Sequence, residues 1–284
     1  MKIAITGASG RFGRGLQLAL EQKHTIYPLR HADVDVTKAD DVERVLTAIH
    51  PDVVIHAAAL PDIDYCETHP EETHKVNVEG TRNVMRGAAQ IGAGLVHIST
   101  DAVFDGTKRE PYVESDAANP ISVYGRSKLA AEQVVKEYER QWIFRVSVLF
   151  GPGKENFVSK AIEQVRAGVV HKVASDQLGS ATYTLDAGAK ILEVVEAKAY
   201  GLYHLCNSGP CTRMDLAKQA VADAGLDPEL VQGTPTAAMN RPGPRVKYAV
   251  MEMAALRNRG FKEPRPWQEA LREYVKTYIQ SEKQ

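Results

Sequence analysis

The chain has 284 residues, enough for one large domain or one and a half, and 44% of them are hydrophobic, 7% aromatic and 25% charged. These proportions exclude an intrinsically disordered chain and are typical of a globular protein. Because 35 Lys and Arg residues oppose 36 Asp and Glu residues, the net charge is -1, and no field of one sign exists to attract nucleic acid or an anionic membrane.

The sequence predicts neither a membrane span nor a secretory signal. No apolar run reaches the roughly 18 residues of a membrane span, and the amino-terminal residues lead directly into a strand pattern, unlike a signal peptide. The chain has three cysteines, Cys66, Cys206 and Cys211. They are scattered, with no CxxC pair, which favours a reduced, cytoplasmic protein without a disulfide framework or a structural zinc site.

Short β-branched runs alternate with helical patterns through the first half of the chain. Strands are predicted over residues 2–6, 25–29, 52–56, 94–99 and 142–149. Helices are predicted between them: one with Leu16, Ala19 and Leu20 on one face, one with Val42, Val45, Leu46 and Ile49 on one face, and two over residues 76–91 and 129–138. This alternation predicts the α/β class with a doubly wound, parallel, Rossmann-like sheet.

The pattern changes after the Gly-Pro-Gly sequence at 151–153, where helix-rich and irregular Pro/Gly segments follow. We therefore expect residues 1–150 to form a dinucleotide-binding domain and residues 151–284 to form mainly a smaller C-terminal substrate-binding lobe. Within that second part, a helix and a strand near 184–207 are expected to return to the main sheet.

The segment TGASGRFG joins the first predicted strand to the first predicted helix. Its glycines, Gly7, Gly10 and Gly13, have a GxxGxxG spacing, which differs by one residue from the GxGxxG dinucleotide fingerprint. Glycines let the backbone turn tightly and approach a pyrophosphate, whose charge then lies at the helix amino terminus. The loop, with Arg11 and Phe12, therefore predicts a dinucleotide cofactor, although a tight turn without a ligand would use the same glycines.

The end of the second strand bears on the choice between NADP(H) and NAD(H). NAD-dependent enzymes usually place an acidic residue near here for the ribose 2′-hydroxyl, whereas this chain has Arg30. A guanidinium there would pair with a 2′-phosphate, so we expect NADPH, with NADH as the alternative; a solvent-facing arginine would fit equally well. Asp35, in the following turn, would hydrogen-bond the adenine or cap the next helix.

Tyr124 and Lys128 lie four residues apart in a helical stretch and hence on one face. A phenol with a pKa of about 10 is a weak acid–base catalyst at neutral pH, and a neighbouring ammonium lowers that pKa. Thr100 follows a buried strand, at the sheet edge where open α/β sheets bind ligands, so its hydroxyl is expected to bind a substrate oxygen beside Tyr124. Without the glycine loop, Tyr124 and Lys128 would be interpreted as a surface pair.

Four segments in this order, TGASGRFG, HAAAL, STDAVFDG and NPISVYGRSKLAAE, resemble the extended short-chain dehydrogenases/reductases. The chain looks most like the dTDP-4-dehydrorhamnose reductases in that family, and the resemblance covers nearly the whole chain. It implies that Tyr124 is the general acid, that Lys128 holds the nicotinamide ribose and tunes Tyr124, and that Thr100 orients the carbonyl. Ala57 and Ala58 would line the cofactor through their backbone.

Several residues depart from the family pattern at positions that lie close to the sugar. Ala102 stands where the family usually has Tyr, and Val148 stands where it usually has Trp, so the exact sugar stays open. Nucleotide-sugar dehydratases resemble the same family but carry Asp-Glu after the threonine; this chain has Asp101 followed by Ala102, which favours a simple reductase. Arg241, in a Pro/Gly-rich stretch, is expected to receive the substrate diphosphate or to belong to a solvated basic loop.

The expected function is NAD(P)H-dependent reduction of the 4-keto group of a nucleotide-activated deoxysugar, with substrate contacts at Thr100, Ala102, Val148 and Arg241. Two alternatives stay open. One is a non-catalytic NADP-binding regulatory subunit, because the regulatory subunit of methionine adenosyltransferase resembles the same reductases and keeps the Tyr and Lys. The other is a reductase of a different ketone.

The remaining expectations concern metals and partners. The nine histidines show no metal-site spacing, and His56 and His97 are interpreted as core or strand-end groups, so no metal is predicted. The expected partner is the small-molecule substrate, with neither nucleic acid nor membrane, and a homodimer is the expected assembly if the chain is not monomeric.

Overall fold

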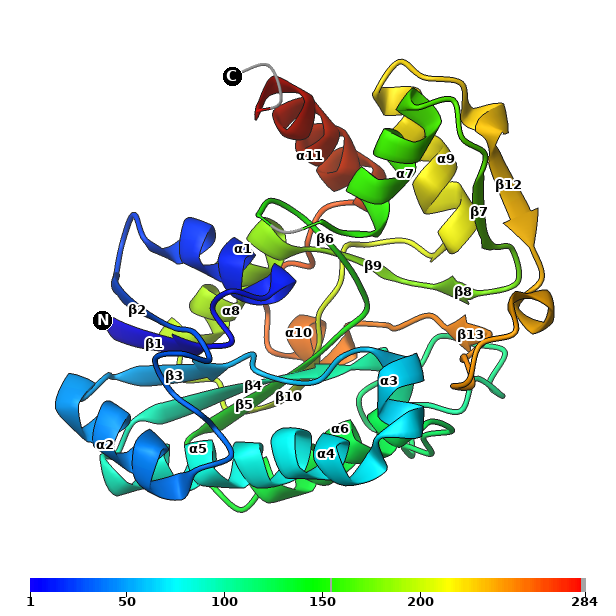
Figure 1. Ribbon diagram of the computed structural model, residues 1–284. Coiled ribbons are helices and arrows are strands. Elements are labelled where there is room, and N and C mark those ends of the chain that lie inside the picture. The colour runs from blue at the N-terminus through cyan, green and yellow to red at the C-terminus, as the bar shows by residue number, and fades with distance from the viewer. Residues whose placement is uncertain (154, 282–284) are drawn as a thin grey trace.

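The computed structural model of the protein describes residues 1–153 and 155–281 and contains a central sheet of six strands (Figure 1). In order across the sheet, these are β10 (Gly201–His204), β5 (Gln141–Val146), β4 (Gly94–Thr100), β3 (Val53–His56), β1 (Lys2–Thr6) and β2 (Thr25–Leu29). Every neighbouring pair is parallel, from Gly201 beside Trp142 at one edge to Lys2 beside Thr25 at the other. The predicted doubly wound α/β sheet is confirmed.

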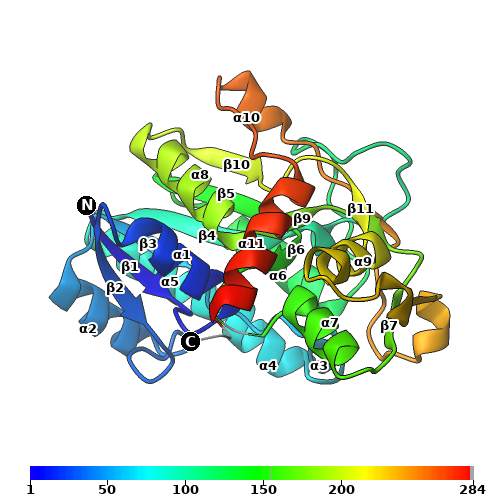
Figure 2. The ribbon, with the colours of Figure 1, turned by 90° about the horizontal axis from the view of Figure 1, so that it is seen from above.

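Helices cover both faces of this sheet (Figure 1 and Figure 2). One face carries α1 (Arg11–Leu20) and α8 (Thr184–Glu196), and the other carries α2 (Ala39–Ile49), α5 (Gly80–Gln90) and α6 (Val123–Val135). The first two helices pack closely, because a Cβ added to Gly188 would lie 2.7 Å from the Ala19 Cβ. The chain thus returns through α8 and β10 to the main sheet.

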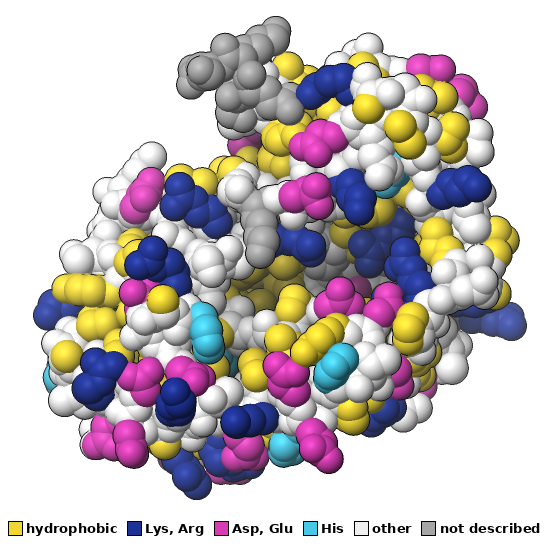
Figure 3. All heavy atoms as spheres, viewed as in Figure 1, with side chains coloured by type: hydrophobic (Ala, Val, Ile, Leu, Met, Phe, Trp, Pro, Cys, Tyr) yellow, Lys and Arg dark blue, Asp and Glu magenta, His cyan; other side chains and the backbone are white. Residues whose placement is uncertain are grey.

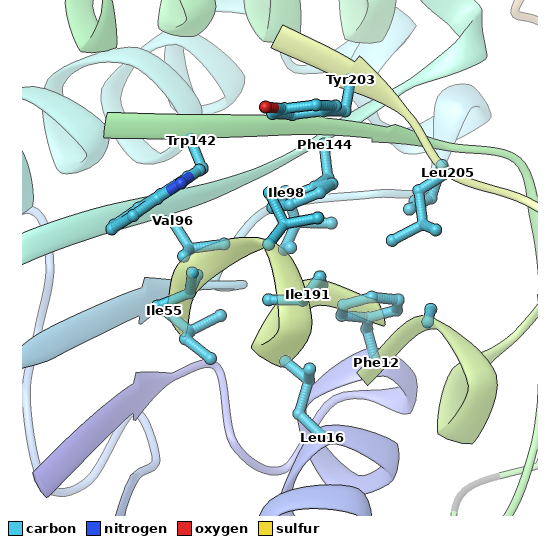
Figure 4. Packing of buried hydrophobic residues seen from close by; sticks show 14 of the residues in the cluster. Phe12, Leu16, Ile55, Val96, Ile98, Trp142, Phe144, Ile191, Tyr203 and Leu205 are labelled. Atoms are coloured by element: carbon cyan, nitrogen blue, oxygen red, sulfur yellow. The ribbon is translucent and has the colours of Figure 1, made fainter. Parts of the chain in front are cut away.

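Core residues alternate along the strands, which explains why both faces need a cover. In β4, Val96 and Ile98 pack with α1 and α8, while Leu95 packs with the helices of the other face. Figure 4 shows the first of these layers, where Phe12 and Leu16 of α1 meet the strands. Each fully buried aliphatic or aromatic side chain stabilises the fold by roughly 1.5–3 kcal/mol, so the two layers of core residues hold the sheet and its helices firmly together.

The other elements form a smaller lobe and the short helices that pack against α6 or β10 of the sheet domain (Figure 1). The lobe contains β6 (Val148–Phe150), α7 (Phe157–Arg166), β7 (His171–Ala174), β8 (Leu178–Gly179), β9 (Ala181–Tyr183), β11 (Cys211–Thr212), α9 (Arg213–Asp223), β12 (Val231–Thr234), β13 (Tyr248–Ala249) and α11 (Trp267–Ser281). The short helices are α3 (Ile63–Thr68), α4 (Pro70–His74) and α10 (Ala254–Asn258). No helix in the described ranges is long and apolar enough to cross a membrane.

The helix that carries the predicted tyrosine begins earlier than expected. The prediction placed a helix over 129–138, whereas α6 begins at Val123 and ends at Val135. The Ser122 hydroxyl caps it by accepting a hydrogen bond from Gly125 N at 3.1 Å. The cap places the whole of the tyrosine and lysine motif inside the helix.

Two other boundaries also differ from the prediction. The helix expected over 76–91 opens with a π-helical turn, Lys75–Glu79, before α5. The strand expected over 142–149 is divided at Ser147 into β5 and β6. Ser147 N donates to the Thr182 hydroxyl of the lobe, so at this residue the chain leaves the main sheet and pairs with β9 instead.

Candidate active site

The carboxyl ends of β1 and β3 meet at a topological switch point. β1 lies between β2 and β3, so the chain leaves it towards one neighbour and later returns on the other side. Ligands of open α/β sheets bind at such a point. The glycine loop follows Thr6 and the Ala57 segment follows His56, and therefore both predicted cofactor segments reach the same place.

The glycine loop is shaped for close approach of the backbone. Gly7 has a φ of +70°, and a Cβ there would lie 2.6 Å from the Ala58 nitrogen. A Cβ on Gly13 would lie 2.3 Å from the Gly7 carbonyl oxygen. α1 begins after Gly10, and no described side chain caps its first N–H groups. These N–H groups and the helix dipole fit the pyrophosphate of a dinucleotide.

A cavity of about 320 Å³ opens beside this loop, in the hollow between the sheet and the lobe (Figure 3). Its walls contain these predicted site residues: Gly10, Arg11, Phe12, Gly13, Ala57, Thr100, Tyr124 and Lys128. They also contain residues that the sequence did not single out: Ala59, Pro61, Ile98, Ser99, Val146, Ser147 and Leu149. Five separate segments of the sequence therefore meet around one space.

Thr100, Tyr124 and Lys128 face this cavity from two elements. Thr100 ends β4, while α6 places Tyr124 in its first turn and Lys128 one turn later. The lower pKa expected for Tyr124 is not found, because burial raises its pKa and the Thr100 hydroxyl beside it opposes that rise. Burial lowers the pKa of Lys128 to about 8, against the attraction of Glu132. A protonated phenol and a buried amino group thus share one wall.

Lys128 is supported by a histidine that the sequence analysis interpreted as a core group. His97 Nε2 lies 3.1 Å from Lys128 Nζ, and burial keeps the His97 pKa well below its usual value, so a neutral ring nitrogen accepts from the ammonium. His56 is buried beside it, with Nδ1 2.7 Å from Thr6 Oγ1 and Nε2 3.1 Å from Thr81 Oγ1. Both histidines are buried, as expected. The alternation of side chains along a strand places His97 on the α6 side of β4, and this pattern could have predicted its contact with Lys128.

A smaller cavity of about 40 Å³ adjoins the first on the side of the lobe. The two share Ser147, and Val148, a predicted substrate residue, lines the smaller one. Ser147 Oγ donates to Asp101 Oδ2 at 2.5 Å, and Arg213, the first residue of α9, lines the same space. Arg213 could not be predicted as a site residue, because no local sequence pattern connects the start of this distant helix with the end of β4.

Ala102 and Arg241 lie outside the walls of both cavities. The Ala102 carbonyl packs against α6, where a Cβ on Gly125 would lie 2.2 Å from its oxygen. Arg241 is exposed and close enough to Asp64 to lower the pKa of that carboxyl, after Arg245. Arg245 Nη2 forms an ion pair with Asp64 Oδ2 at 2.8 Å. Arg241 is thus at the surface and outside both cavities.

Arg30 and Asp35 lie after β2, beside the glycine loop, because Ala8 N donates to the last carbonyl of β2 at 3.2 Å. The Arg30 side chain is 66% exposed and forms an ion pair with Asp33, Nε to Oδ2 at 2.9 Å. Asp35 Oδ1 accepts from Thr37 N at 3.0 Å and from Thr37 Oγ1 at 2.7 Å. Asp35 therefore closes the turn that leads into α2, and the described residues give that helix no side-chain cap.

A parallel, doubly wound sheet with a glycine loop at its switch point, and with Thr, Tyr and Lys around the adjoining cavity, defines an extended short-chain dehydrogenase/reductase. Comparison with known proteins narrows this class. Residues 1–280 match the RmlD substrate binding domain family, and the chain belongs to that family. The resemblance inferred from the sequence motifs is confirmed.

Individual relatives agree with this assignment. The dTDP-4-dehydrorhamnose reductase of Mycolicibacterium smegmatis is 35% identical over 283 residues, which cover 98% of this chain and 86% of that protein. A probable dTDP-4,6-dihydroxy-2-methyloxan-3-one 4-ketoreductase of Streptomyces antibioticus is 35% identical over 96% of this chain and 94% of its own length. Among solved structures, dTDP-4-dehydrorhamnose reductase of Bacillus anthracis in complex with NADP has a TM-score of 0.93 at 34% identity, over 98% of this chain and 99% of that one.

Proposed function

We propose that the protein uses NADPH to reduce the 4-keto group of a nucleotide-activated deoxysugar, as a dTDP-4-dehydrorhamnose reductase does. The observation that carries the proposal is the shared cavity, in which Thr100, Tyr124 and Lys128 face the glycine loop. The names of the relatives support a dTDP-linked sugar, and the NADP in the Bacillus anthracis structure supports the cofactor. Residues 1–150 would mainly bind the cofactor and residues 151–284 the substrate.

The residues at the switch point fit NADPH. The glycine loop and the amino terminus of α1 would hold its pyrophosphate, and the Ala57–Ala58 backbone would lie along it. Lys128 would hold the nicotinamide ribose, and Arg30 would bind the 2′-phosphate by sharing or leaving its exposed ion pair with Asp33, a pair of little net strength. Bound NADPH supplies the hydride for the keto carbon.

The protein's own groups supply the proton and hold the ketone. Tyr124 would donate its proton to the keto oxygen; burial raises its pKa, which keeps the phenol protonated at neutral pH but makes it a weaker acid. The Lys128 ammonium would then stabilise the remaining phenolate. Thr100 Oγ1 accepts from Ala102 N and donates to Asp101 Oδ1, both at 3.1 Å. Its hydrogen would turn from Asp101 to the keto oxygen when substrate binds.

The other proposed substrate contacts are inferred from the positions of Val148, Arg241 and Ala102 relative to the two cavities. Val148 lines the smaller cavity and would touch the sugar. Arg241, exposed beside the lobe, would bind the diphosphate. Ala102 would meet a sugar only if that sugar reaches past the two cavities, because Ala102 lines neither of them.

The direct test follows NADPH absorbance with a panel of ketones that includes a dTDP-4-keto-6-deoxysugar, for the wild-type protein and Tyr124→Phe. We expect turnover of the dTDP sugar by the wild type and a fall in kcat of about 10²–10⁴ in the variant, because the general acid is lost. NADPH affinity should not change. Tyr200→Phe is the matched control, since Tyr200 precedes β10 at the opposite edge of the sheet, and its kcat should equal that of the wild type.

The same panel separates the alternatives. Unchanged turnover in Tyr124→Phe would refute the proposed chemistry. Turnover with another ketone alone would identify a reductase of a different substrate. Tight NADPH binding without any turnover, together with copurification of a partner enzyme, would identify a regulatory subunit.

The expected cytoplasmic location is supported by three free, buried cysteines, Cys66, Cys206 and Cys211. A homodimer stays a prediction, which light scattering tests.

A further inference from the structure

Arg213 lines the smaller cavity, and no carboxylate of the described residues lies within ion-pair distance of its guanidinium. It is the first residue of α9, and the Thr212 hydroxyl caps that helix by accepting from Asp215 N at 3.0 Å, so the backbone under the arginine is held firmly. Its guanidinium carbon lies 5.7 Å from the centre of the Phe157 ring. The described residues give it no hydrogen bond and no ion pair.

The surroundings of Arg213 leave positive charge uncompensated. Burial lowers the pKa of Arg213, attraction to Asp101 opposes this, and repulsion from Arg241 and Arg245 adds to the lowering. Arg245 is neutralised by Asp64 at 2.8 Å, whereas Arg213 and Arg241 have no such pair in the described ranges. Figure 3 shows Lys and Arg side chains gathered on the lobe side of the hollow. A cation that is partly removed from water and left unpaired is costly, so a ligand that brings negative charge would relieve this cost.

Asp101 does not neutralise the charge of Arg213. Its Oδ2 accepts from Ser147 Oγ at 2.5 Å and its Oδ1 accepts from Thr100 Oγ1 at 3.1 Å, and it lies beyond ion-pair distance of Arg213. Because Asp101 directly follows Thr100, the cavity of Arg213 begins where the keto group would be held. A group that reaches Arg213 therefore belongs to the molecule whose ketone lies at Tyr124.

We propose that Arg213 binds an oxyanion of the substrate, an inference that rests on the proposed function of the cleft. A nucleotide sugar has two groups with this chemistry: its diphosphate, and a carboxylate when the sugar carries one. The planar guanidinium binds either group through paired N–H···O bonds, for which a lysine ammonium is a poorer match. Arg213 would thus be a specificity-determining residue in addition to the Thr, Tyr and Lys set.

The experiment compares Arg213→Gln and Arg213→Lys with the wild type in two measurements. Calorimetry of the NADPH-loaded protein with dTDP alone reports binding of the diphosphate. Steady-state reduction of two dTDP-linked 4-keto sugars, one neutral and one with a carboxylate at C5, reports binding of the sugar. We expect Arg213→Gln to weaken one of these by roughly 10- to 100-fold, in Kd or KM and not in kcat, with partial recovery in Arg213→Lys.

The two measurements identify the source of the oxyanion. Weaker dTDP binding, with both sugars affected alike, assigns Arg213 to the diphosphate. Unchanged dTDP binding, with a higher KM for the carboxylated sugar only, assigns it to that carboxylate. Arg272→Gln, which removes an exposed charge from α11, is the matched control and should change neither value. NADPH affinity should be the same in all variants.

Three results would overturn the proposal. The first is wild-type affinity for dTDP and wild-type KM for both sugars in Arg213→Gln. The second is a change in kcat alone, which would mean that Arg213 only supports Asp101. The third is wild-type protein that does not bind dTDP and reduces neither sugar. Failure of the proposed function is distinguishable, since dTDP binding that is lost in Arg213→Gln would support this inference even if no sugar were reduced.

Discussion

The amino group of Lys128 lies almost entirely out of water. The residue is 3% exposed, its Nζ has His97 Nε2 at 3.1 Å, and burial lowers its pKa from 10.5 to about 8. A buried charge without a close carboxylate partner destabilises the folded state. The proposed chemistry nevertheless requires that charge beside Tyr124. Lys128 is therefore a position where stability is lost in favour of function.

Lys128→Met should be more stable than the wild type at pH 7. Removal of the buried charge stabilises the variant by up to about 3 kcal/mol, and loss of the hydrogen bond to His97 offsets about 1 kcal/mol of this gain. The sign follows from proton binding. Between pH 8 and 10.5 the unfolded chain binds the Lys128 proton and the folded chain does not, so wild-type stability rises relative to the variant as pH rises through this range. Urea unfolding at about pH 7 and about pH 9.5 should show the difference narrowing.

The matched control for this prediction is Lys136→Met, which removes an exposed ammonium at the carboxyl end of the same helix. It should change stability by less than about 0.5 kcal/mol at either pH. A Lys128→Met variant that is less stable than the wild type at pH 7, with a difference independent of pH, would contradict the account of the buried charge.

At the level of elements, α6 is tied to the sheet by a buried ion pair. Glu132 accepts from Arg145 Nε and Nη2 of β5, both at 2.8 Å, and from Ser99 Oγ of β4 at 2.6 Å. Glu132 is 0% exposed and Arg145 is 3% exposed. Because α6 carries the tyrosine and lysine of the site while β4 carries the threonine, this contact sets the position of one wall of the cavity relative to the other.

Glu132→Gln should destabilise the protein by about 3–5 kcal/mol, because the Arg145 charge stays buried without its partner. Urea unfolding measures the loss. Glu229→Gln is the control: Glu229 is 80% exposed in a pair with Lys218, and its loss should cost about 0–1 kcal/mol. The double variant Glu132→Leu with Arg145→Met should regain much of the stability. Equal losses of stability in the two Glu→Gln variants would show that the buried ion pair contributes no more to stability than the exposed one.

At the level of the whole molecule, the walls proposed to bind the cofactor and the substrate come from opposite parts of the chain. The glycine loop lies in the sheet domain, and Arg213 lies in the lobe across the hollow. The lobe is joined to the sheet helices by Arg265, which precedes α11 and binds Asp186 of α8 through two contacts at 3.0 Å. A ligand in the hollow therefore stabilises a structure that includes both parts.

NADPH at about 100 times its Kd should raise the free energy of unfolding by about 2.7 kcal/mol. At equal concentration NADH should raise it less, because only NADPH brings a 2′-phosphate to Arg30. Thermal unfolding of Arg30→Ala with each cofactor measures this: the NADPH increment should fall to that of NADH, and the NADH increment should stay unchanged. Arg86→Ala, an exposed arginine on α5, is the control. Equal losses for both cofactors would remove Arg30 from the 2′-phosphate site.

The features that depend on local spacing could be predicted from the amino-acid sequence alone. Alternating strand and helix periods predicted the parallel sheet, the glycine spacing predicted the loop at Gly7 to Gly13, and the four-residue interval put Tyr124 and Lys128 on one helix face. These features follow from backbone geometry within a few residues, which is why they can be inferred without any knowledge of the fold.

Which distant residues meet depends on long-range packing and could not be predicted from the sequence. His97 supports Lys128 because β4 and α6 pack together, and Arg213 reaches the cavity beside Asp101 because α9 begins at the wall of the lobe. The break of the expected strand at Ser147 has the same origin, since its backbone binds Thr182 of the lobe. Such contacts depend on long-range packing, which leaves no periodic signal in the local sequence, and they complete the site around the residues that spacing had already indicated.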